Sequence, residues 1–525
     1  MAGILIADTI AEAGVRMLSE QHDVTVATGL SEDELIEALA GRSALVVRSQ
    51  TQVTARVIES ASQLEVIGRA GVGVDNIDLD AATQNGVIVA NAPLANTLSA
   101  AEHAMALMLA LARNIPQGDA SLRAGEWKRA ELMGIELAGR TLGIVGLGRI
   151  GSEVARRARA FEMQVVAYDP FVSEDRAGQL GVQLMSFDEL LATSDFVSLH
   201  TALYEGNHGM LGVDQLAKAK PGIRIINTAR GALIDEQALY DAVESGHVAG
   251  AAIDVFSEEP ANGNILTTHP NILVTPHLAA STVEAQDRAA VQVAEQVLAV
   301  LSGGTARFAV NAPLVDPETM AVIGPYIDAA ELASCVATQL AEGGVQKLRI
   351  EYLGEIANHE TALIRAGVIV GMLERVSTAK VTIVNAEQLA EERGLRIEEK
   401  TGPAPPPYAN LVVVHAVTES GEIRVAATHT PSGRRIVGIG DFEVEIAATT
   451  NHLLAIENIN LPGMIGAVGQ LLGRFGRNIS SMSVAAGPEG TALMALSVDG
   501  ALTAEQLAEI VAIDQIHRVR QVDLT

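Results

Sequence analysis

The sequence predicts an α/β protein with two doubly wound parallel sheets, followed by an α+β region and a C-terminal βαββαβ unit. Two observations predict the parallel sheets. Short apolar runs alternate with helix-like segments over roughly the first 308 residues, and one run leads straight into a glycine-rich turn. From about Ala309 the pattern changes to longer helical and strand-like segments. With 525 residues and 48% hydrophobic content, the chain can hold three or four domains of about 150 residues each.

The first parallel sheet is predicted from apolar runs at residues 4–8, 24–27, 44–48, 66–69 and 87–90. No glycine-rich phosphate turn follows the first three runs, so residues 1–98 are expected to form a substrate domain rather than a second nucleotide domain. A long amphipathic helix at 282–301, ended by Gly303 and Gly304, is expected to return residues 283–308 to this domain.

A dinucleotide site is predicted at residues 141–170, where a strand, the turn GLGRIG, a helix and a second strand ending in Asp169 follow one another. An ordinary βαβ turn is the alternative. In the dinucleotide pattern Gly146 permits a tight turn, Gly148 leaves room for a pyrophosphate, and Gly151 lets the helix pack closely on the strand. The free N–H groups at the start of the helix favour a diphosphate.

The nucleotide is expected to be NAD rather than NADP. Asp169 lies 23 residues after Gly146 (169 − 146), near the spacing of about 20 for an acid that bonds a ribose 2′-hydroxyl and repels a 2′-phosphate. The residues of this stretch predicted to hold NAD are Gly146, Gly148, Arg149, Ile150, Gly151 and Asp169.

The remaining strands of this Rossmann-like domain, expected to span residues 99–282, each end in polar residues. Because ligands bind outside the carboxyl ends of parallel strands, these stretches are expected to converge on the cofactor. The residues predicted there are Thr201, Thr228, Ala229, Arg230, Asp254, His277 and Ala280. A strongly apolar helix at 99–115 is expected to be buried between domains or subunits and to contribute a dimer contact.

Arginine, glutamate and histidine at these strand ends suggest hydride transfer between NAD and a 2-hydroxy acid. Arg230 can clamp a carboxylate with two parallel hydrogen bonds, and His277 can remove a hydroxyl proton because imidazole titrates near neutral pH. Glu259 paired with His277 would fix the tautomer of the imidazole. Taken singly, such residues are more often a solvated turn arginine or a structural histidine, and the order of the three motifs is what favours catalysis.

The composition limits the partners. A formal net charge of −28 disfavours nucleic acid and anionic membranes, so an anionic substrate has to be held by a local cluster of arginines. The single cysteine, Cys335, excludes an intramolecular disulfide and a cysteine-based zinc site, and no metal site is predicted. The start of the chain lacks a basic region, and every apolar stretch is judged shorter than the ~18 residues of a membrane span, so a cytoplasmic protein is expected.

The stretches NTARGALID, AAIDVFSEEP and TPHLAAST, following GLGRIG, closely resemble the D-isomer-specific 2-hydroxyacid dehydrogenase family over residues 1 to about 308. In that family the arginine of the first stretch, the glutamate of the second and the histidine of the third are catalytic. The resemblance therefore implies that Arg230, Glu259 and His277 are the catalytic residues, with His277 as the proton donor when a 2-oxo acid is reduced.

Three further stretches, VVRSQTQVT, IGRAGVGVDNID and NAPLANTLSAAEHAM, resemble family members that oxidise 3-phosphoglycerate to 3-phosphohydroxypyruvate with NAD, the first step of L-serine synthesis. The resemblance implies that Arg48 and Arg69 receive the phosphate and the carboxylate, and that Asn96 lies close to the substrate with Arg230 and His277. Surface charge is the alternative for Arg48 and Arg69. Two other functions stay open: reduction of another 2-oxo acid, such as 2-oxoglutarate, hydroxypyruvate or glyoxylate, and a non-enzymatic role in sensing NAD.

Residues 309–446 are predicted to form an α+β domain that resembles the intervening domain of the long family members. Helices are expected at 327–342 and 360–373, and strands at 346–353, 381–384, 410–417 and 421–428. Residues 447–525 are predicted to form a βαββαβ ferredoxin-like unit. Its strands are expected at 447–456, 479–485, 492–498 and 516–522, and its helices at 465–475 and 503–511.

The last unit, which contains ENINLPGMIGAVGQLLGRFGRNISSMSV, resembles an ACT domain, a module that binds amino acids as allosteric effectors. The resemblance implies effector contacts from Asn458, Asn460 and Asn478 and feedback inhibition by L-serine. Leu461 stands where such a loop commonly has a basic residue. Because this module typically pairs, and because the helix at 99–115 is so apolar, we expect a homo-oligomer, either a dimer or a homotetramer.

Overall fold

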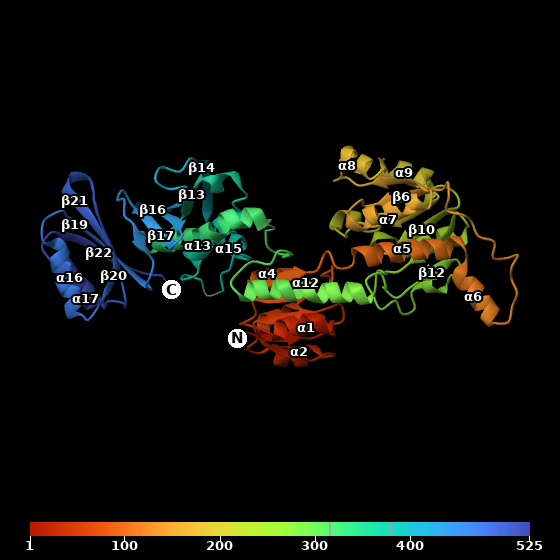
Figure 1. The fold of residues 1–525 in the computed structure, drawn as a ribbon, viewed down its shortest axis with the longest axis horizontal. Coiled ribbons are helices and arrows are strands. Elements are labelled where there is room, and N and C mark those ends of the chain that lie inside the picture. The colour runs from red at the N-terminus through yellow and green to blue at the C-terminus, as the bar shows by residue number, and fades with distance from the viewer. Residues whose placement is uncertain (314, 316, 378–379, 525) are drawn as a thin grey trace.

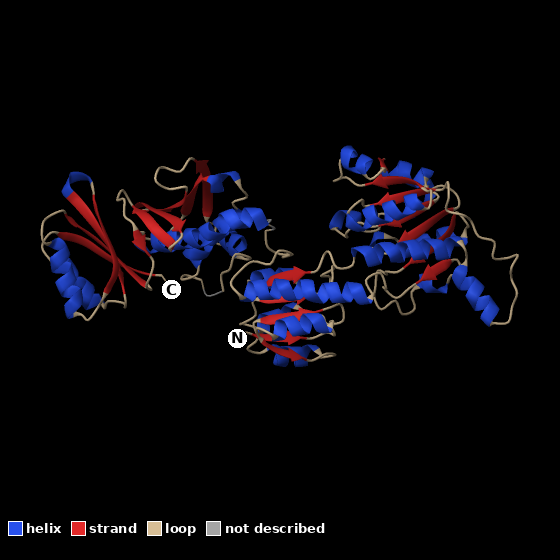
Figure 2. Ribbon diagram, in the orientation of Figure 1, coloured by secondary structure: helices blue, strands red, loops and turns tan. Residues whose placement is uncertain are grey.

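The structure is a computed structural model that describes residues 1–313, 315, 317–377 and 380–524. Its strands form four sheets, and Figure 1 shows them as four units, with the C-terminal unit at one end and the second unit at the other. Helices pack on the faces of all four sheets (Figure 2). The first two sheets are parallel, the third is mixed and the fourth is antiparallel, which confirms the predicted fold class.

The first unit is a parallel sheet in the order β2-β1-β3-β4-β5. Its strands are β1 (Gly3–Ile6), β2 (Asp23–Val26), β3 (Ala44–Val47), β4 (Val66–Arg69) and β5 (Ile88–Asn91). Its helices are α1 (Glu12–Ser19), α2 (Glu32–Leu39), α3 (Ala55–Ser60), α4 (Leu79–Gln84) and α12 (Val283–Leu301). The strand order reverses between β1 and β3, so the loops after these two strands diverge and leave a crevice at the carboxyl edge of the sheet.

Helix α12 returns from the second unit to the first, as its amphipathic pattern predicts. Its Val293 and Val297 are fully buried in the core that the first sheet forms on one face. An added Cβ at Gly68 on β4 would lie 2.6 Å from Val293 Cγ2, so the helix and the sheet are in close contact. At the other end, the hydroxyls of Thr282 and Ser99 lie 2.7 Å apart, which ties together the two connections between the units.

The second unit is a parallel sheet in the order β12-β11-β10-β9-β6-β7-β8, the arrangement of a Rossmann fold with one more strand at its end. Its strands are β6 (Thr141–Val145), β7 (Gln164–Tyr168), β8 (Gln183–Leu184), β9 (Phe196–Leu199), β10 (Ile223–Asn227), β11 (Val248–Ile253) and β12 (Ile272–Val274). Its helices are α5 (Thr97–Ala112), α6 (Ile115–Arg123), α7 (Arg149–Ala160), α8 (Glu174–Gln179), α9 (Phe187–Thr193), α10 (Val213–Lys218) and α11 (Glu236–Glu244). The crevice at the reversal between β6 and β9 is where a dinucleotide is expected.

The apolar helix predicted at 99–115 is α5, which ends at Ala112 and is followed by the separate helix α6. Its Ala104, Met105 and Met108 are buried in one core with side chains of β6 and α7. This side of α5 therefore covers the sheet of its own unit, which accounts for most of its apolar character.

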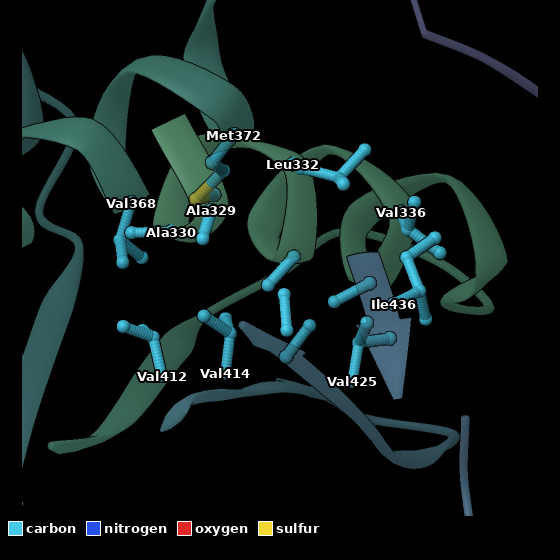
Figure 3. Close-up of a cluster of buried hydrophobic side chains, with 14 of the residues drawn as sticks. Ala329, Ala330, Leu332, Val336, Val368, Met372, Val412, Val414, Val425 and Ile436 are labelled. Carbon is cyan, nitrogen blue, oxygen red and sulfur yellow. The ribbon is translucent and has the colours of Figure 1, made fainter. Parts of the chain in front are cut away.

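The third unit, the intervening unit, has a six-stranded sheet in the order β14-β13-β15-β16-β17-β18. Its strands are β13 (Lys347–Gly354), β14 (Arg396–Gly402), β15 (Asn410–Thr418), β16 (Gly421–Thr430), β17 (Gly433–Ile439) and β18 (Ile446–Ala447), and its helices are α13 (Pro317–Leu340), α14 (Ala362–Leu373) and α15 (Ala386–Glu392). Figure 3 shows how α13 and α14 cover the sheet, with Leu332, Val336 and Met372 above Val414 and Val425.

The predicted strand at 381–384 is wrong. This segment forms the turn that precedes α15, and it packs on the first unit: Thr382 Oγ1 donates to the Gly86 carbonyl at 3.3 Å, and Asn385 Nδ2 donates to the Gln84 carbonyl at 3.2 Å. Val384 is buried in the core of the first unit. The apolar residues of this segment therefore pack in two cores, Val384 in that of the first unit and Val381 in that of the intervening unit, without forming a strand. The strands β14, β17 and β18 were not predicted.

Helix α13 corrects the prediction that every apolar stretch of the chain is too short to span a membrane. Among the residues that the structure describes, the stretch Glu318–Leu340 is long and apolar enough to cross a membrane by length and composition. Half of its apolar window, 50%, is buried in the protein, and Pro325 lies inside the helix. Its Ala329, Ala333 and Val336 belong to the core that the helix shares with the six-stranded sheet, so its apolar character matches that of a core helix.

The C-terminal unit is antiparallel, in the order β20-β21-β19-β22, which is the ferredoxin-like topology predicted for it. Its elements are β19 (His452–Ile459), α16 (Met464–Arg474), β20 (Ile479–Ala486), β21 (Thr491–Val498), α17 (Ala504–Val511) and β22 (Ile516–Asp523). The strand predicted to begin at residue 447 begins at His452, because Ala447 pairs with Arg435 in the preceding sheet.

The two faces of the C-terminal sheet have different partners. Leu454 and Ile456 point into a core with α16 and α17, while Leu453 and Ala455 belong to the core of the intervening unit. Helix α13 reaches the edge strand β22, where the Gln339 side-chain amide donates to the carbonyl of Asp523 at 2.7 Å. The sheet is therefore clamped between its own helices and the intervening unit.

Candidate active site

The glycine-rich turn has the geometry that a bound dinucleotide requires. Gly146 has φ +93°, and an added Cβ would lie 2.8 Å from the His200 carbonyl carbon. A Cβ at Gly151 would lie 2.1 Å from the Gly146 carbonyl oxygen, so only glycine lets α7 approach β6 so closely. A Cβ at Gly148 would meet nothing within 4 Å, so the backbone here faces open space. The three glycines thus serve two purposes, close packing and access for a ligand.

The start of α7 is free to hold an anion. Gly148 occupies the N-cap position, and no side chain caps the helix there. Arg149 and Ile150 begin the helix, so their unpaired N–H groups face the open side of the turn. Asp169, at the end of β7, accepts a hydrogen bond from the Leu147 N–H at 2.8 Å, which places its carboxylate beside the same turn. These residues fit NAD: amides for the diphosphate and an acid for the ribose.

A cleft of about 1070 Å³ opens between the first and second units, and all of the predicted substrate and catalytic residues line it. Those that line it are Arg48, Arg69, Asn96, Arg230, Glu259, His277 and Ala280. The remaining predicted cofactor residues are not part of this lining: Gly146, Gly148, Arg149, Ile150, Gly151, Asp169, Thr201, Thr228, Ala229 and Asp254. Among these, Thr228 is buried, and its hydroxyl has no hydrogen-bond partner among the described residues, which suits a ligand.

His277 and Glu259 form a hydrogen-bonded pair. His277 Nδ1 lies 2.8 Å from Glu259 Oε2, which leaves Nε2 available to a ligand in the cleft. Burial alone would raise the pKa of Glu259, but hydrogen bonds from His277 and from the Phe256 N–H outweigh it, so the pKa is lowered. Glu259 is therefore a carboxylate at neutral pH, which is the form that orients an imidazole.

Buried Asp254 shapes the loop that carries His277. It is 0% exposed, and its carboxylate accepts hydrogen bonds from the N–H groups of Leu278 and Ala279 at 2.8 and 2.9 Å. His103 of α5 approaches the same carboxylate at 3.1 Å. Burial would raise the pKa of Asp254, but these hydrogen bonds lower it. Asp254 thus holds the loop that places His277, whose φ is +53°, in the cleft. The predicted contact of Asp254 with the cofactor stays a prediction.

Arg230 follows β10 in a turn that Asn227 organises. Asn227 is 1% exposed and donates to the Arg230 carbonyl at 2.9 Å, while its side-chain oxygen accepts the Ala229 N–H at 3.0 Å. The guanidinium of Arg230 reaches across the cleft to the first unit, where its Nε lies 3.3 Å from Asp75 Oδ2. Asp75 was not among the predicted residues.

Arg48 and Arg69 stand at the ends of β3 and β4, at the carboxyl edge of the first sheet. The backbone N–H of Arg48 donates to buried Asp8 at 2.6 Å, and Asn76 donates to the Arg48 carbonyl at 2.8 Å, so two side chains fix the backbone there. Arg69 is half-buried, and burial together with the charges of Arg230 and Arg48 lowers its pKa to about 10. Its Nε has no hydrogen-bond partner among the described residues. Three clustered and half-buried cations make this end of the cleft a site for an anion.

The three predicted effector residues do not come together within one chain. Asn458 pairs with Ala492 at one end of β21, whereas β20, which follows Asn478, pairs with Val498 at the other end. Six residues of strand separate these positions by on the order of 20 Å. Asn458 is 2% exposed, and its side-chain oxygen has no partner among the described residues.

Comparison with known proteins identifies the family of this site. Residues 105–279 match the NAD binding domain of the D-isomer specific 2-hydroxyacid dehydrogenases, and residues 322–440 match the intervening domain of D-3-phosphoglycerate dehydrogenase. D-3-phosphoglycerate dehydrogenase of Archaeoglobus fulgidus is 41% identical over 99% of this chain and 100% of its own length. The chain belongs to the D-isomer specific 2-hydroxyacid dehydrogenase family. Its second unit is therefore the NAD binding domain of an oxidoreductase, and NAD is its cofactor.

Other members of the family show how far this similarity extends. D-3-phosphoglycerate dehydrogenase of Bacillus subtilis is 41% identical over 100% of both chains. Among solved structures, D-lactate dehydrogenase of Aquifex aeolicus, in complex with NAD and lactic acid, has 28% identity and a TM-score of 0.53, covering 59% of this chain and 99% of that one. A glyoxylate reductase of Paecilomyes thermophila has 33% identity and a TM-score of 0.55, covering 59% and 98%. The two D-3-phosphoglycerate dehydrogenases therefore match this chain over nearly its whole length, across all four units. The two solved structures match 59% of it.

Proposed function

We propose that this dehydrogenase oxidises (2R)-3-phosphoglycerate to 3-phosphohydroxypyruvate with NAD, the first step of L-serine synthesis. The observation that carries the proposal is the cluster of Arg48, Arg69 and Arg230 in one cleft with the His277–Glu259 pair. In a chain with a net charge of −28, three arginines around one cleft are a local device for a strongly anionic ligand. A phosphorylated hydroxy acid has the two anionic groups that such a cluster can bind, and the relatives named for this activity share the full length of the chain.

Each residue of the cleft has a role in the proposed reaction. Arg230 binds the carboxylate of the substrate. Arg48 and Arg69 bind its phosphate, which carries the rest of the negative charge. Asn96 lies close enough to the cleft to bond a substrate oxygen. His277 takes the C2 hydroxyl proton on Nε2, while its Nδ1–H donates to the Glu259 carboxylate, which stabilises the imidazolium. NAD held at the glycine-rich turn of the second unit would supply the acceptor for the hydride of C2.

Reduction of an unphosphorylated 2-oxo acid is the second candidate, because Arg230, Glu259 and His277 are sufficient for it. Hydroxypyruvate, glyoxylate and 2-oxoglutarate all present a carboxylate to Arg230. Hydroxypyruvate and glyoxylate carry no second anionic group, so they would leave at least one cation of the cluster without an anionic partner. The second carboxylate of 2-oxoglutarate carries one negative charge, less than the roughly −1.5 to −2 of a phosphate, so the cluster favours a phosphorylated substrate. A non-enzymatic NAD sensor is disfavoured by the intact hydrogen bond between His277 and Glu259.

The deciding experiment follows NADH consumption with phosphohydroxypyruvate, hydroxypyruvate and 2-oxoglutarate, each with and without L-serine. We expect the highest kcat/KM with phosphohydroxypyruvate. No turnover of that substrate would refute the main proposal, and faster turnover of 2-oxoglutarate would favour the second candidate. No turnover of any substrate would favour an NAD sensor.

We also propose that L-serine is an effector bound at the C-terminal unit by Asn458, Asn460 and Asn478. Because Asn478 lies far from the other two within one chain, a site that uses all three requires two copies, which supports a homo-oligomer, a dimer or a homotetramer. Analytical ultracentrifugation with and without L-serine tests this: a monomer would contradict it. A cytoplasmic location stays a prediction.

A further inference from the structure

The ion pair between Asp75 and Arg230 joins the two walls of the cleft. Asp75 lies in the loop after β4 of the first unit, and Arg230 follows β10 of the second. Arg230 Nε lies 3.3 Å from Asp75 Oδ2, with the Arg230 side chain 31% exposed and the Asp75 side chain 70% exposed. Both residues line the same cleft.

The neighbouring glycine makes this approach possible. An added Cβ at Gly73 would lie 2.3 Å from Arg230 Nη2 and 2.8 Å from Asp75 Oδ2. Gly73 has no positive φ, so an alanine there would meet a steric obstacle without backbone strain. The loop therefore leaves room for the Arg230 side chain to pack against Gly73 while its guanidinium pairs with the Asp75 carboxylate.

We propose that Asp75 is a competitor built into the site, whose carboxylate occupies Arg230 until the carboxylate of a substrate displaces it. The proposal rests on the function proposed above, in which Arg230 binds that carboxylate. Aspartate presents to a guanidinium the same group as a 2-hydroxy acid, so one carboxylate is exchanged for another. The exchange selects against ligands that lack a carboxylate, and it keeps Arg230 directed into the cleft before substrate arrives.

The test is Asp75→Asn, which keeps the size of the side chain and removes its charge. An exposed ion pair of this kind alters an equilibrium by about two- to fivefold. We therefore expect the variant to lower the KM for phosphohydroxypyruvate by about two- to fivefold with an unchanged kcat, because Asp75 has left Arg230 before the chemical step. An unchanged or raised KM overturns the proposal, and a raised KM would mean that Asp75 only positions Arg230.

A second comparison separates competition from a general change in charge. Competition at Arg230 lowers KM by the same factor for phosphohydroxypyruvate and hydroxypyruvate, whereas a change in the local potential favours the more highly charged phosphorylated substrate. Asp80→Asn, at an exposed position on α4 away from the cleft lining, controls for the loss of one negative charge and should leave both KM values unchanged. Unequal factors, or the same gain from Asp80→Asn, overturn the proposal.

A binding measurement with oxamate tests the competitor role of Asp75 without requiring that phosphohydroxypyruvate is the substrate. This 2-oxo carboxylate analogue is titrated into the NADH-loaded protein by calorimetry, and Asp75→Asn should lower its Kd by about two- to fivefold. If phosphohydroxypyruvate is not turned over, the proposed function fails, and the competitor proposal stands or falls on this titration. Equal Kd values in the two proteins, or no binding in either, overturn it.

Discussion

The two parallel units share one architecture but expose different chemistry at the same edge. In the second unit the turn after β6 offers backbone groups to a ligand, because Gly148 faces open space and no side chain caps the start of α7. In the first unit the corresponding strand ends carry side-chain cations, Arg48 after β3 and Arg69 at the end of β4. A doubly wound sheet thus provides the location of a site, and the loops determine whether it suits a diphosphate or a compact anion.

This difference also explains how the cleft is made. The second unit contributes His277, Glu259 and Arg230, and the first contributes Arg48, Arg69 and Asp75. Neither wall is a complete site. The relative position of the two units therefore determines whether a substrate held by the arginines of the first unit can reach His277 of the second. The connections that fix this position are α5 and α12, which are joined by Ser99 and Thr282.

The largest expected effect comes from the acid–base group of the second unit. His277→Asn should lower kcat by about 10²–10⁴-fold, because asparagine cannot exchange a proton at neutral pH but tolerates the positive φ of this position. Steady-state rates with phosphohydroxypyruvate measure the effect, and His517→Asn on the exposed surface of β22 is the matched control. Near-normal turnover in His277→Asn would transfer the role to another residue.

A smaller but more selective loss is expected in the first unit. Arg48→Ala removes one charge-assisted contact, which should raise the KM for phosphohydroxypyruvate by about 10–100-fold and that for hydroxypyruvate by less. The substitution keeps the backbone hydrogen bond to Asp8, so the strand end should keep its shape. Arg16→Ala, at an exposed position on α1, controls for the lost charge. An equal loss for both substrates would mean that Arg48 does not bind the phosphate.

The backbone geometry of the candidate nucleotide site could be predicted from the sequence because its residues are close together in the chain. Glycines, helix and acid lie within residues 141–170, and each glycine has the space or the contact expected of it. Strand β14 was not predicted because its sequence, RIEEKTG, is largely charged and its side chains are mostly exposed. The segment 381–384 misled in the opposite way: its apolar residues suggest a strand, but Val384 is buried against the first unit and Val381 belongs to the core of the intervening unit.

The cleft was predicted only in part. Arg230, Glu259 and His277 stand in recognisable motifs, but their supporting residues do not. His103 contacts Asp254 from a helix 151 positions earlier, and Asp75 contacts Arg230 from the other unit. A histidine on the strongly apolar helix α5 was the available signal for His103. No local pattern marks Asp75, because its contact depends on how two sheets face one another.

A pair of glycine substitutions separates packing from binding in the second unit. Gly151→Ala puts a Cβ 2.1 Å from a backbone oxygen and should destabilise the protein by about 1–3 kcal/mol. Gly148→Ala meets no protein atom within 4 Å, so its melting temperature should hold while the KM for NAD rises. Thermal melts without nucleotide, together with the KM for NAD, measure both effects. Equal melting temperatures for the two variants would contradict the packing role of Gly151.

The smallest expected effect is a dependence of stability on pH that originates in Glu259. Its pKa is lowered in the folded protein, so its contribution is fully present above the unfolded value of about 4.3 and is lost as pH falls through the folded value. Urea unfolding should therefore show wild type more stable than Glu259→Gln at pH 7, with the difference shrinking below about pH 4. Glu258→Gln, a neighbouring exposed carboxylate outside the cleft lining, is the matched control. A difference that grows as pH falls would mean that the pair with His277 does not stabilise the ionised carboxylate.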